Sequence, residues 1–134
     1  MTKSKTVKRI FIGLLILNFL MELIVSLGIL INFPLAVKVG FGINYTDDMA
    51  TIGIGLGSNL ALTAVVFLLS IIWTIRNKTE GVILGIAGAG MLILFASLTF
   101  LQLGDTSGLL ADGIRGALTV TFGYLTLKPL QKSE

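Results

Sequence analysis

Residues 10–31 read IFIGLLILNFLMELIVSLGILI, a run of 22 residues in which Glu22 is the only charged side chain. A helix needs about 20 mostly apolar residues to cross a hydrocarbon core about 30 Å thick. Three more stretches, residues 50–75, 81–103 and 109–127, are also long and mainly apolar. We therefore predict an all-α integral membrane fold, an up-down-up-down bundle of four transmembrane helices.

The amino-acid composition agrees with a membrane protein. Of the 134 residues, 54% are hydrophobic and 13% are charged, whereas soluble proteins carry about 25% charged residues. The longest segment between the apolar stretches, an outer loop over residues 32–49, is too short for a soluble catalytic domain, so we expect a single membrane domain over residues 1–134. The chain has no Cys and no His, which excludes thiolate chemistry and the commonest metal ligand. We expect neither a cofactor nor a metal site.

The basic residues predict how the chain is oriented. Cytoplasmic loops carry an excess of Lys and Arg, and a bundle of four spans puts both termini on one side. That side holds eight of the ten basic residues, whereas the other side holds only Lys38, and Arg115 falls inside the fourth stretch. We therefore expect a multi-pass protein of the cell membrane with both termini in the cytoplasm, and no nucleic-acid partner for its net charge of +3. The eight residues are Lys3, Lys5, Lys8, Arg9, Arg76, Lys78, Lys128 and Lys132.

The outer loop has a regular pattern of its own. Its odd positions from Leu35 to Ile43 are apolar and the positions between them are small or polar, an alternation typical of a strand. One interpretation is a flap that rests at the level of the lipid headgroups, anchored by Phe33, Phe41 and Tyr45. The other interpretation is a lid over a pocket.

Short turns and small residues indicate how the helices pack. The turns at residues 76–80 and 104–108 are tight, which makes the helices on either side of each turn antiparallel neighbours. Gly81 and Gly85 form a G-x-x-x-G pattern, and Gly113, Gly116 and Gly123 lie along one broad side of the last stretch. Small residues allow helix backbones to approach closely in lipid, so these glycines predict packing within the bundle or between copies. We expect a homo-oligomer or a membrane-protein partner.

Polar side chains inside the apolar stretches are the candidate functional residues, because a charge in the bilayer is costly and therefore faces the interior. Asn18 and Glu22 are spaced i, i+4 on one helix face. With a rise of about 1.5 Å per residue, Glu22 and Asn59 lie about 13 Å and Arg115 about 9 Å below the outer end of their stretches. Asp112 precedes Arg115 by one turn. We predict a polar layer in the outer half of the bundle and take Asn18, Glu22, Asn59, Asp112 and Arg115 as candidate ligand-binding residues.

Two structural interpretations stand beside a functional one. In the first, Glu22 pairs with Arg115, and Asn59 helps to lock the helix register. In the second, Arg115 turns toward the outer surface and pairs with Asp112, while Glu22 stays protonated because burial disfavours its charged form. In the functional interpretation, the layer is a polar pocket that holds a small amphiphilic ligand, a proton or an ion.

The layout resembles the DoxX-like family of small four-helix membrane proteins. The points of resemblance are Pro34 after the first stretch, Gly53, Gly55 and Gly57 at the opening of the second, and Asp112-Gly113 with Arg115 in the fourth. The resemblance covers most of the chain by hydropathy and implies a four-helix membrane fold. Some members of the family are similar to quinone-linked oxidoreductase subunits.

The function predicted from these residues is binding or transport of a small amphiphilic or lipid-like ligand. Glu22 would be the acceptor or protonatable group, Arg115 the partner of an anion, and Asn59 an orienting amide. One alternative is a non-catalytic accessory or structural subunit of a larger membrane complex. The other is an enzyme that transfers protons on a lipid or isoprenoid, with Glu22 or Asp112 as acid or base. The absence of His and Cys favours a protein that is not an enzyme.

Overall fold

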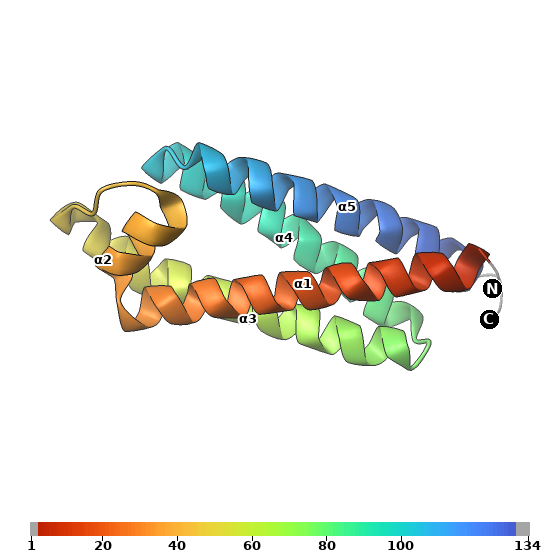
Figure 1. Ribbon diagram of the computed structural model, residues 1–134. Helices are drawn as coiled ribbons and strands as arrows, with labels where there is room; N and C mark the ends of the chain where they lie inside the picture. Colours follow the sequence, from red (N-terminus) through yellow and green to blue (C-terminus); the bar gives the residue numbers. More distant parts are fainter. Residues whose placement is uncertain (1–2, 131–134) are drawn as a thin grey trace.

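The computed structural model describes residues 3–130, and four long helices make up most of them (Figure 1). Consecutive long helices run in opposite directions, and each packs against two of the others. Helix α1 contacts α3 and α5, and α4 contacts the same two helices. The prediction of an all-α fold is confirmed, and the neighbours predicted from the two tight turns are correct. The helices are α1 Lys3–Ile31, α3 Ala50–Ile75, α4 Thr79–Leu103 and α5 Thr106–Leu130.

The segment between α1 and α3 is mainly helical and not a strand. It forms α2 Phe33–Ala36, the π-helix η1 Val37–Phe41 and the 3-10 turn η2 Asp47–Met49. The Asn32 side chain starts α2 by accepting a hydrogen bond from the Leu35 amide, and Gly42 ends η1 in the left-handed region at φ 68°. The alternating apolar positions misled the prediction because a proline at the start of α2 and this glycine favour a short helical turn.

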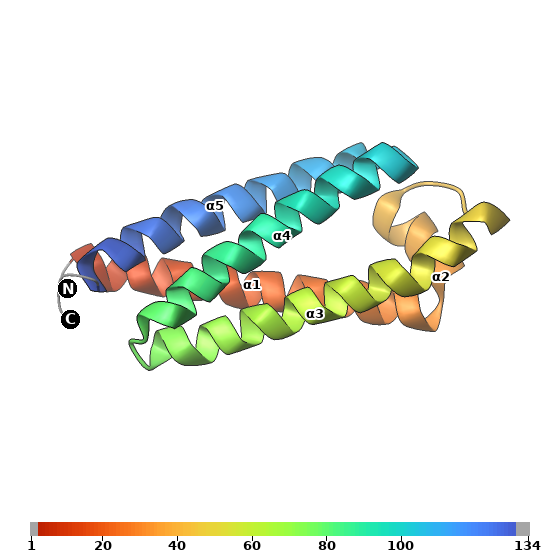
Figure 2. The ribbon, with the colours of Figure 1, turned by 180° about the vertical axis from the view of Figure 1, so that it is seen from behind.

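The bundle is closed at one end and spread at the other. Helices α1 and α3 form one pair and α4 and α5 form a second. The two pairs converge where the termini lie, which we call the terminal end, and diverge toward the opposite end, which we call the loop end (Figures 1 and 2). The α2–η1 segment lies between the diverging pairs, and its Val37 side chain is fully buried. This segment therefore covers the space that the spread helices leave.

The terminal end is held by apolar packing and by glycines. Phe11 and Leu15 of α1 form a buried cluster with side chains of α3 and α4. A Cβ atom added at Gly85 would lie 2.6 Å from Ser70 Oγ and 2.8 Å from Phe11 Cζ, and one added at Gly123 would lie 3.0 Å from Phe11 Cε2. These glycines therefore pack within the bundle, where they allow the helices to close around the Phe11 ring.

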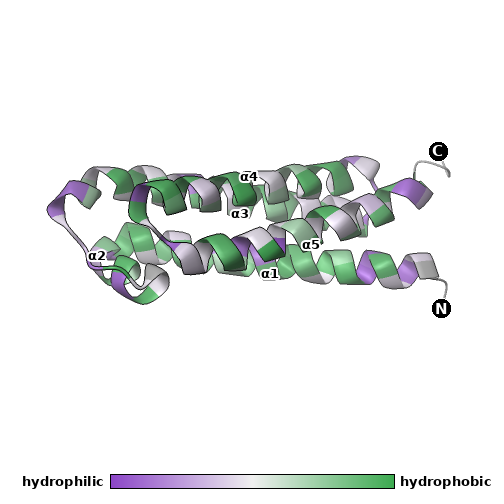
Figure 3. Cartoon of the chain, turned by 90° about the horizontal axis from the view of Figure 1, so that it is seen from above, coloured by the Kyte–Doolittle hydropathy of each residue, from purple (hydrophilic) through white to green (hydrophobic). Residues whose placement is uncertain are grey.

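Large apolar side chains are exposed along all four long helices. Figure 3 shows hydrophilic residues near the helix ends and a few in the middle of the bundle. Three helical segments are long and apolar enough to cross a membrane: Ser4–Ile31, Asp47–Ile75 and Thr79–Leu103. They indicate a membrane protein. Helix α5 is the least apolar of the four long helices, and it carries Asp112 and Arg115.

Candidate functional site

Helix α1 presents a row of polar side chains to the bundle interior. Asn18, Glu22 and Ser26 are all buried, as their spacing of four residues predicts. Ser26 Oγ donates a hydrogen bond of 2.8 Å to the Gly57 carbonyl oxygen and so joins α1 to α3. The other two residues face α5.

An ion pair and a hydrogen-bond network join α1 to α5. Arg115 Nη2 lies 3.1 Å from Glu22 Oε1 and also donates to Asp112 Oδ1, one turn earlier on the same helix. Arg115 Nη1 donates to Asn18 Oδ1 at 3.4 Å. The arginine is 16% exposed and Glu22 only 3%. Arg115 therefore faces inward. The Glu22–Arg115 pair of the first interpretation and the Asp112–Arg115 pair of the second are both present, whereas the part of the second in which Arg115 turns to the surface and Glu22 stays apart is wrong.

Thr119 completes the network, although the sequence analysis did not single it out. Asn18 Nδ2 donates to Thr119 Oγ1 at 2.8 Å, and Thr119 Oγ1 donates to the Arg115 carbonyl oxygen at 2.7 Å. Thr119 lies one turn after Arg115, on the same face of α5. That spacing is the signal that could have identified it.

Asn59 does not join these residues. Its side chain is exposed, whereas Leu60 and Thr63 of the same helix are buried. The depth estimate placed Asn59 at the height of Glu22, but height along a helix does not determine the direction in which a side chain points. Asn59 instead lines a second cavity of about 270 Å³ between α3 and α4, together with Gln102.

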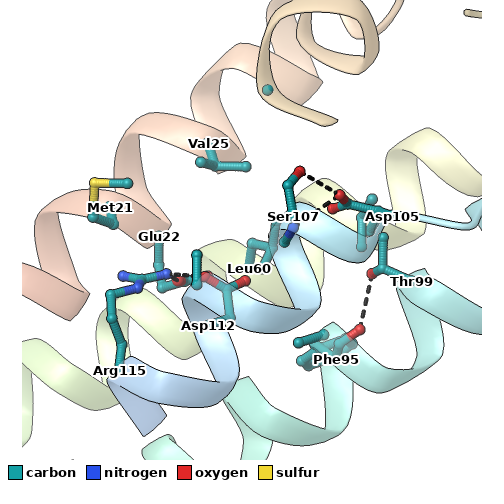
Figure 4. A pocket seen from close by; sticks show the side chains of 15 residues that line it. Met21, Glu22, Val25, Leu60, Phe95, Thr99, Asp105, Ser107, Asp112 and Arg115 are labelled. Carbon is teal, nitrogen blue, oxygen red and sulfur yellow. Dashed lines mark hydrogen bonds and ion pairs between the residues drawn. The ribbon is translucent and has the colours of Figure 1, made fainter. Parts of the chain in front are cut away.

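A cavity of about 270 Å³ lies beside the ion pair, toward the loop end. Figure 4 shows Glu22, Asp112 and Arg115 on one side of it, and Asp105 with Ser107 on the other. Gly40 of η1 contributes to the lining, so the segment between α1 and α3 borders the cavity. The remaining wall is mainly apolar, and it includes Val25, Leu56, Leu60, Phe95 and Ala96.

Asp105 also belongs to the site, although the sequence predicted it only as part of the turn at residues 104–108. Its side chain is 2% exposed, and its Oδ1 accepts hydrogen bonds of 2.9 Å from the Gly108 amide and from Ser107 Oγ. These are the contacts of a helix N-cap, a position that favours Asp. An Asp directly before a helical stretch is the signal that could have placed it at the start of α5.

The lining of the cavity combines a few charged groups with a mainly apolar wall. It contains three carboxyl groups and one guanidinium, surrounded by aliphatic and aromatic side chains. Within residues 3–130, no three His, Cys, Asp or Glu side chains are placed to hold a metal ion. A cavity with few polar groups on an apolar wall is typical of sites for small organic ligands.

Comparisons with known proteins identify no relative of this chain. No protein-family model matches it, and neither the curated proteins nor the solved structures contain a significant match.

Proposed function

We propose that this chain is a multi-pass protein of the cell membrane that binds a small amphiphilic or lipid-like ligand in the outer half of its helix bundle. The observation that carries the proposal is the cavity of about 270 Å³ at the loop end. Three of its four charged groups lie together at Glu22, Asp112 and Arg115, Asp105 lies on the opposite side, and aliphatic and aromatic side chains form most of the remaining wall. A cavity with both charged and apolar surface suits an amphiphile, which has a polar headgroup and an apolar chain.

We propose that all four long helices cross the bilayer. Helix α5 follows α4 after only Gly104 and Asp105 and packs antiparallel to it, so it returns across the same thickness. Its polar groups Asp112 and Arg115 are partnered with each other and with α1 inside the bundle, which lowers the cost of placing them in lipid. The excess of Lys and Arg at the terminal end then supports cytoplasmic termini.

Gly40 lines the cavity, and this glycine provides a direct test of the proposal. A Cβ atom added at Gly40 meets nothing within 4 Å, so the backbone there accepts a side chain, and Gly40→Phe adds a large one to the lining of the cavity. Gly90 of α4 is equally unobstructed and exposed, and it does not line the cavity. Gly90→Phe is therefore a matched control.

The experiment uses the full chain in phosphatidylcholine nanodiscs. The probes are three single-chain amphiphiles with the same diazirine-bearing C10 chain and an ammonium, a carboxylate or a hydroxyl headgroup. We expect saturable photolabelling by at least one probe, reduced about tenfold or more in apparent affinity by Gly40→Phe (about 1.4 kcal/mol) and unchanged by Gly90→Phe. Saturable labelling by none of the probes, or equal labelling of both variants, would refute the proposal.

A further inference from the structure

We propose that the ligand is a cationic single-chain amphiphile, with an ammonium headgroup beside Glu22 and Asp112 and a hydrocarbon chain in a groove between α1 and the α2–η1 segment. This inference rests on the proposed function, because it specifies the ligand of the same cavity.

Two carboxylates share one guanidinium at Arg115. Glu22 Oε1 and Asp112 Oδ1 both accept a hydrogen bond from the same nitrogen, Arg115 Nη2. One guanidinium therefore serves two carboxylates. An uncompensated charge is costly in the interior of a membrane protein, so a cationic group beside the two carboxylates would be favoured here.

The carboxylates beside Arg115 also keep oxygen atoms that accept no hydrogen bond from the described part of the chain. No described residue donates a hydrogen bond to Glu22 Oε2 or to Asp112 Oδ2, and neither oxygen is among the fully buried atoms without a partner, so both keep some accessible surface. Ionised carboxylates only accept hydrogen bonds, whereas an alkylammonium group only donates them. The unused groups in this part of the cavity are acceptors, so they match a headgroup that supplies donors.

The surroundings of Arg115 also bear on an anionic headgroup, for which the sequence predicted Arg115 as the partner. The guanidinium is already engaged by Glu22, Asp112 and Asn18. A carboxylate or phosphate entering the cavity would add a negative charge next to two existing ones. Like charges at close range in a medium of low dielectric constant repel strongly. The surroundings of Arg115 therefore disfavour an anion.

Asp105 extends the acidic lining toward the loop end. It precedes Asp112 by seven residues, or about 10 Å along α5 at about 1.5 Å per residue. Its Oδ1 is used by the helix cap, whereas its Oδ2 has no hydrogen-bond partner among the described residues. A cation moving from the loop end to Glu22 would pass this carboxylate, which adds to the attraction along the path.

The place for the chain is an apolar groove of about 350 Å³ on the outside of the loop end. It is bounded by α1 on one side and by α2 and η1 on the other, and Ile24 and Val39 in its lining are 64% and 76% exposed. Val25 and Gly40 line both this groove and the cavity, so the two spaces adjoin there. In our proposal, an amphiphile with its headgroup at Glu22 passes Val25 and Gly40 and places its chain in this groove.

The test compares the three diazirine probes described above, which share a chain and differ only in the headgroup. We expect the ammonium probe to label the full chain in nanodiscs with at least tenfold higher apparent affinity than the carboxylate probe, each corrected for its partition into the bilayer. The labelled peptides should come from α1 beyond Glu22 and from η1. Glu22→Gln should reduce this preference severalfold, and Glu80→Gln, at an exposed position at the terminal end, should leave it unchanged.

A second variant keeps the test valid if Glu22→Gln does not fold. Asp105→Asn retains an N-cap side chain and removes only the charge, and it should also weaken the preference for the ammonium probe. Saturable labelling that depends on Gly40 but favours the carboxylate or hydroxyl probe would overturn the cationic ligand and leave the proposed function standing. Labelling outside the groove would overturn the placement of the chain, and saturable labelling by no probe would overturn both proposals.

Discussion

Arg115 of α5 contacts Glu22 of α1 at 3.1 Å, across 93 positions of the sequence. The contact joins the first long helix to the last, and these two helices close the ring that α3 and α4 complete. The ion pair therefore acts both as a connection between the two helix pairs and as one wall of the cavity. Each of these roles can be tested separately.

Removing the positive member of the pair should destabilise the protein strongly. Arg115→Gln leaves Glu22 and Asp112 without their shared guanidinium, and breaking a buried pair in this way costs about 3–5 kcal/mol. The free energy of unfolding in detergent would measure the loss. Adding Glu22→Gln to Arg115→Gln should restore much of it, whereas Arg76→Gln, in the exposed turn before α4, should have little effect. Equal losses in the single and double variants would contradict a pairing role.

The Asn18–Thr119 hydrogen bond should stabilise the bundle by a smaller amount. Thr119→Val removes the acceptor of the Asn18 amide with little change in shape, and such interhelical bonds contribute about 0.6 kcal/mol on average and up to about 1.7 kcal/mol. Thr121→Val is the matched control, because its hydroxyl bonds only to the Ala117 carbonyl of its own helix and the residue is exposed. Unfolding in mixed micelles should distinguish the two variants, and an equal effect would show that the bond between α1 and α5 is not significant.

Two glycines of α4 should respond in opposite ways to alanine. At Gly85 a Cβ atom would lie 2.6 Å from Ser70 Oγ and 2.8 Å from Phe11 Cζ, and overpacking of this kind costs about 1–3 kcal/mol. At Gly90 nothing lies within 4 Å, and alanine favours a helix over glycine by about 0.5–1 kcal/mol. We expect a lower melting temperature for Gly85→Ala and an equal or higher one for Gly90→Ala. A tolerated alanine at Gly85 would show that the terminal end is packed less tightly than described.

Asn59 should be dispensable for the network around Arg115. Its exposed position predicts that Asn59→Leu changes the free energy of unfolding by less than about 0.5 kcal/mol, the usual range for surface substitutions. Asn18→Leu should cost more, because Asn18 is fully buried and bonds to both Thr119 and Arg115. The two variants differ only in position, so the same unfolding measurement compares them. A larger loss for Asn59→Leu would place its amide inside the network.

The orientation in the membrane is testable with single cysteines, because the chain contains none of its own. We expect Asn44→Cys, between η1 and η2, to react with a membrane-impermeant maleimide on intact cells. Lys78→Cys, in the turn between α3 and α4, should react only after permeabilisation. The physical reason is the excess of Lys and Arg on the Lys78 side. The reverse pattern would place the termini outside the cytoplasm.

The sequence by itself determined the long helices and their order along the chain. Apolar stretches of about 20 residues or more predict helices because the backbone must satisfy its own hydrogen bonds in lipid. The predicted turns at residues 76–80 and 104–108 are too short for anything but antiparallel neighbours. The face of α1 that carries Asn18 and Glu22 followed from their spacing, because residues four apart lie on one side of a helix.

Only the tertiary structure decided which groups meet in the site. The rotation of α3 about its axis points Asn59 away from Glu22. The two helix pairs diverge at the loop end and leave a cavity there, which Asp105, Gly40 and Arg115 all line. Local patterns report the depth and the face of a residue within its own helix. They do not report how one helix is rotated and tilted against another, because that depends on packing summed over the whole bundle, including the glycines that surround Phe11.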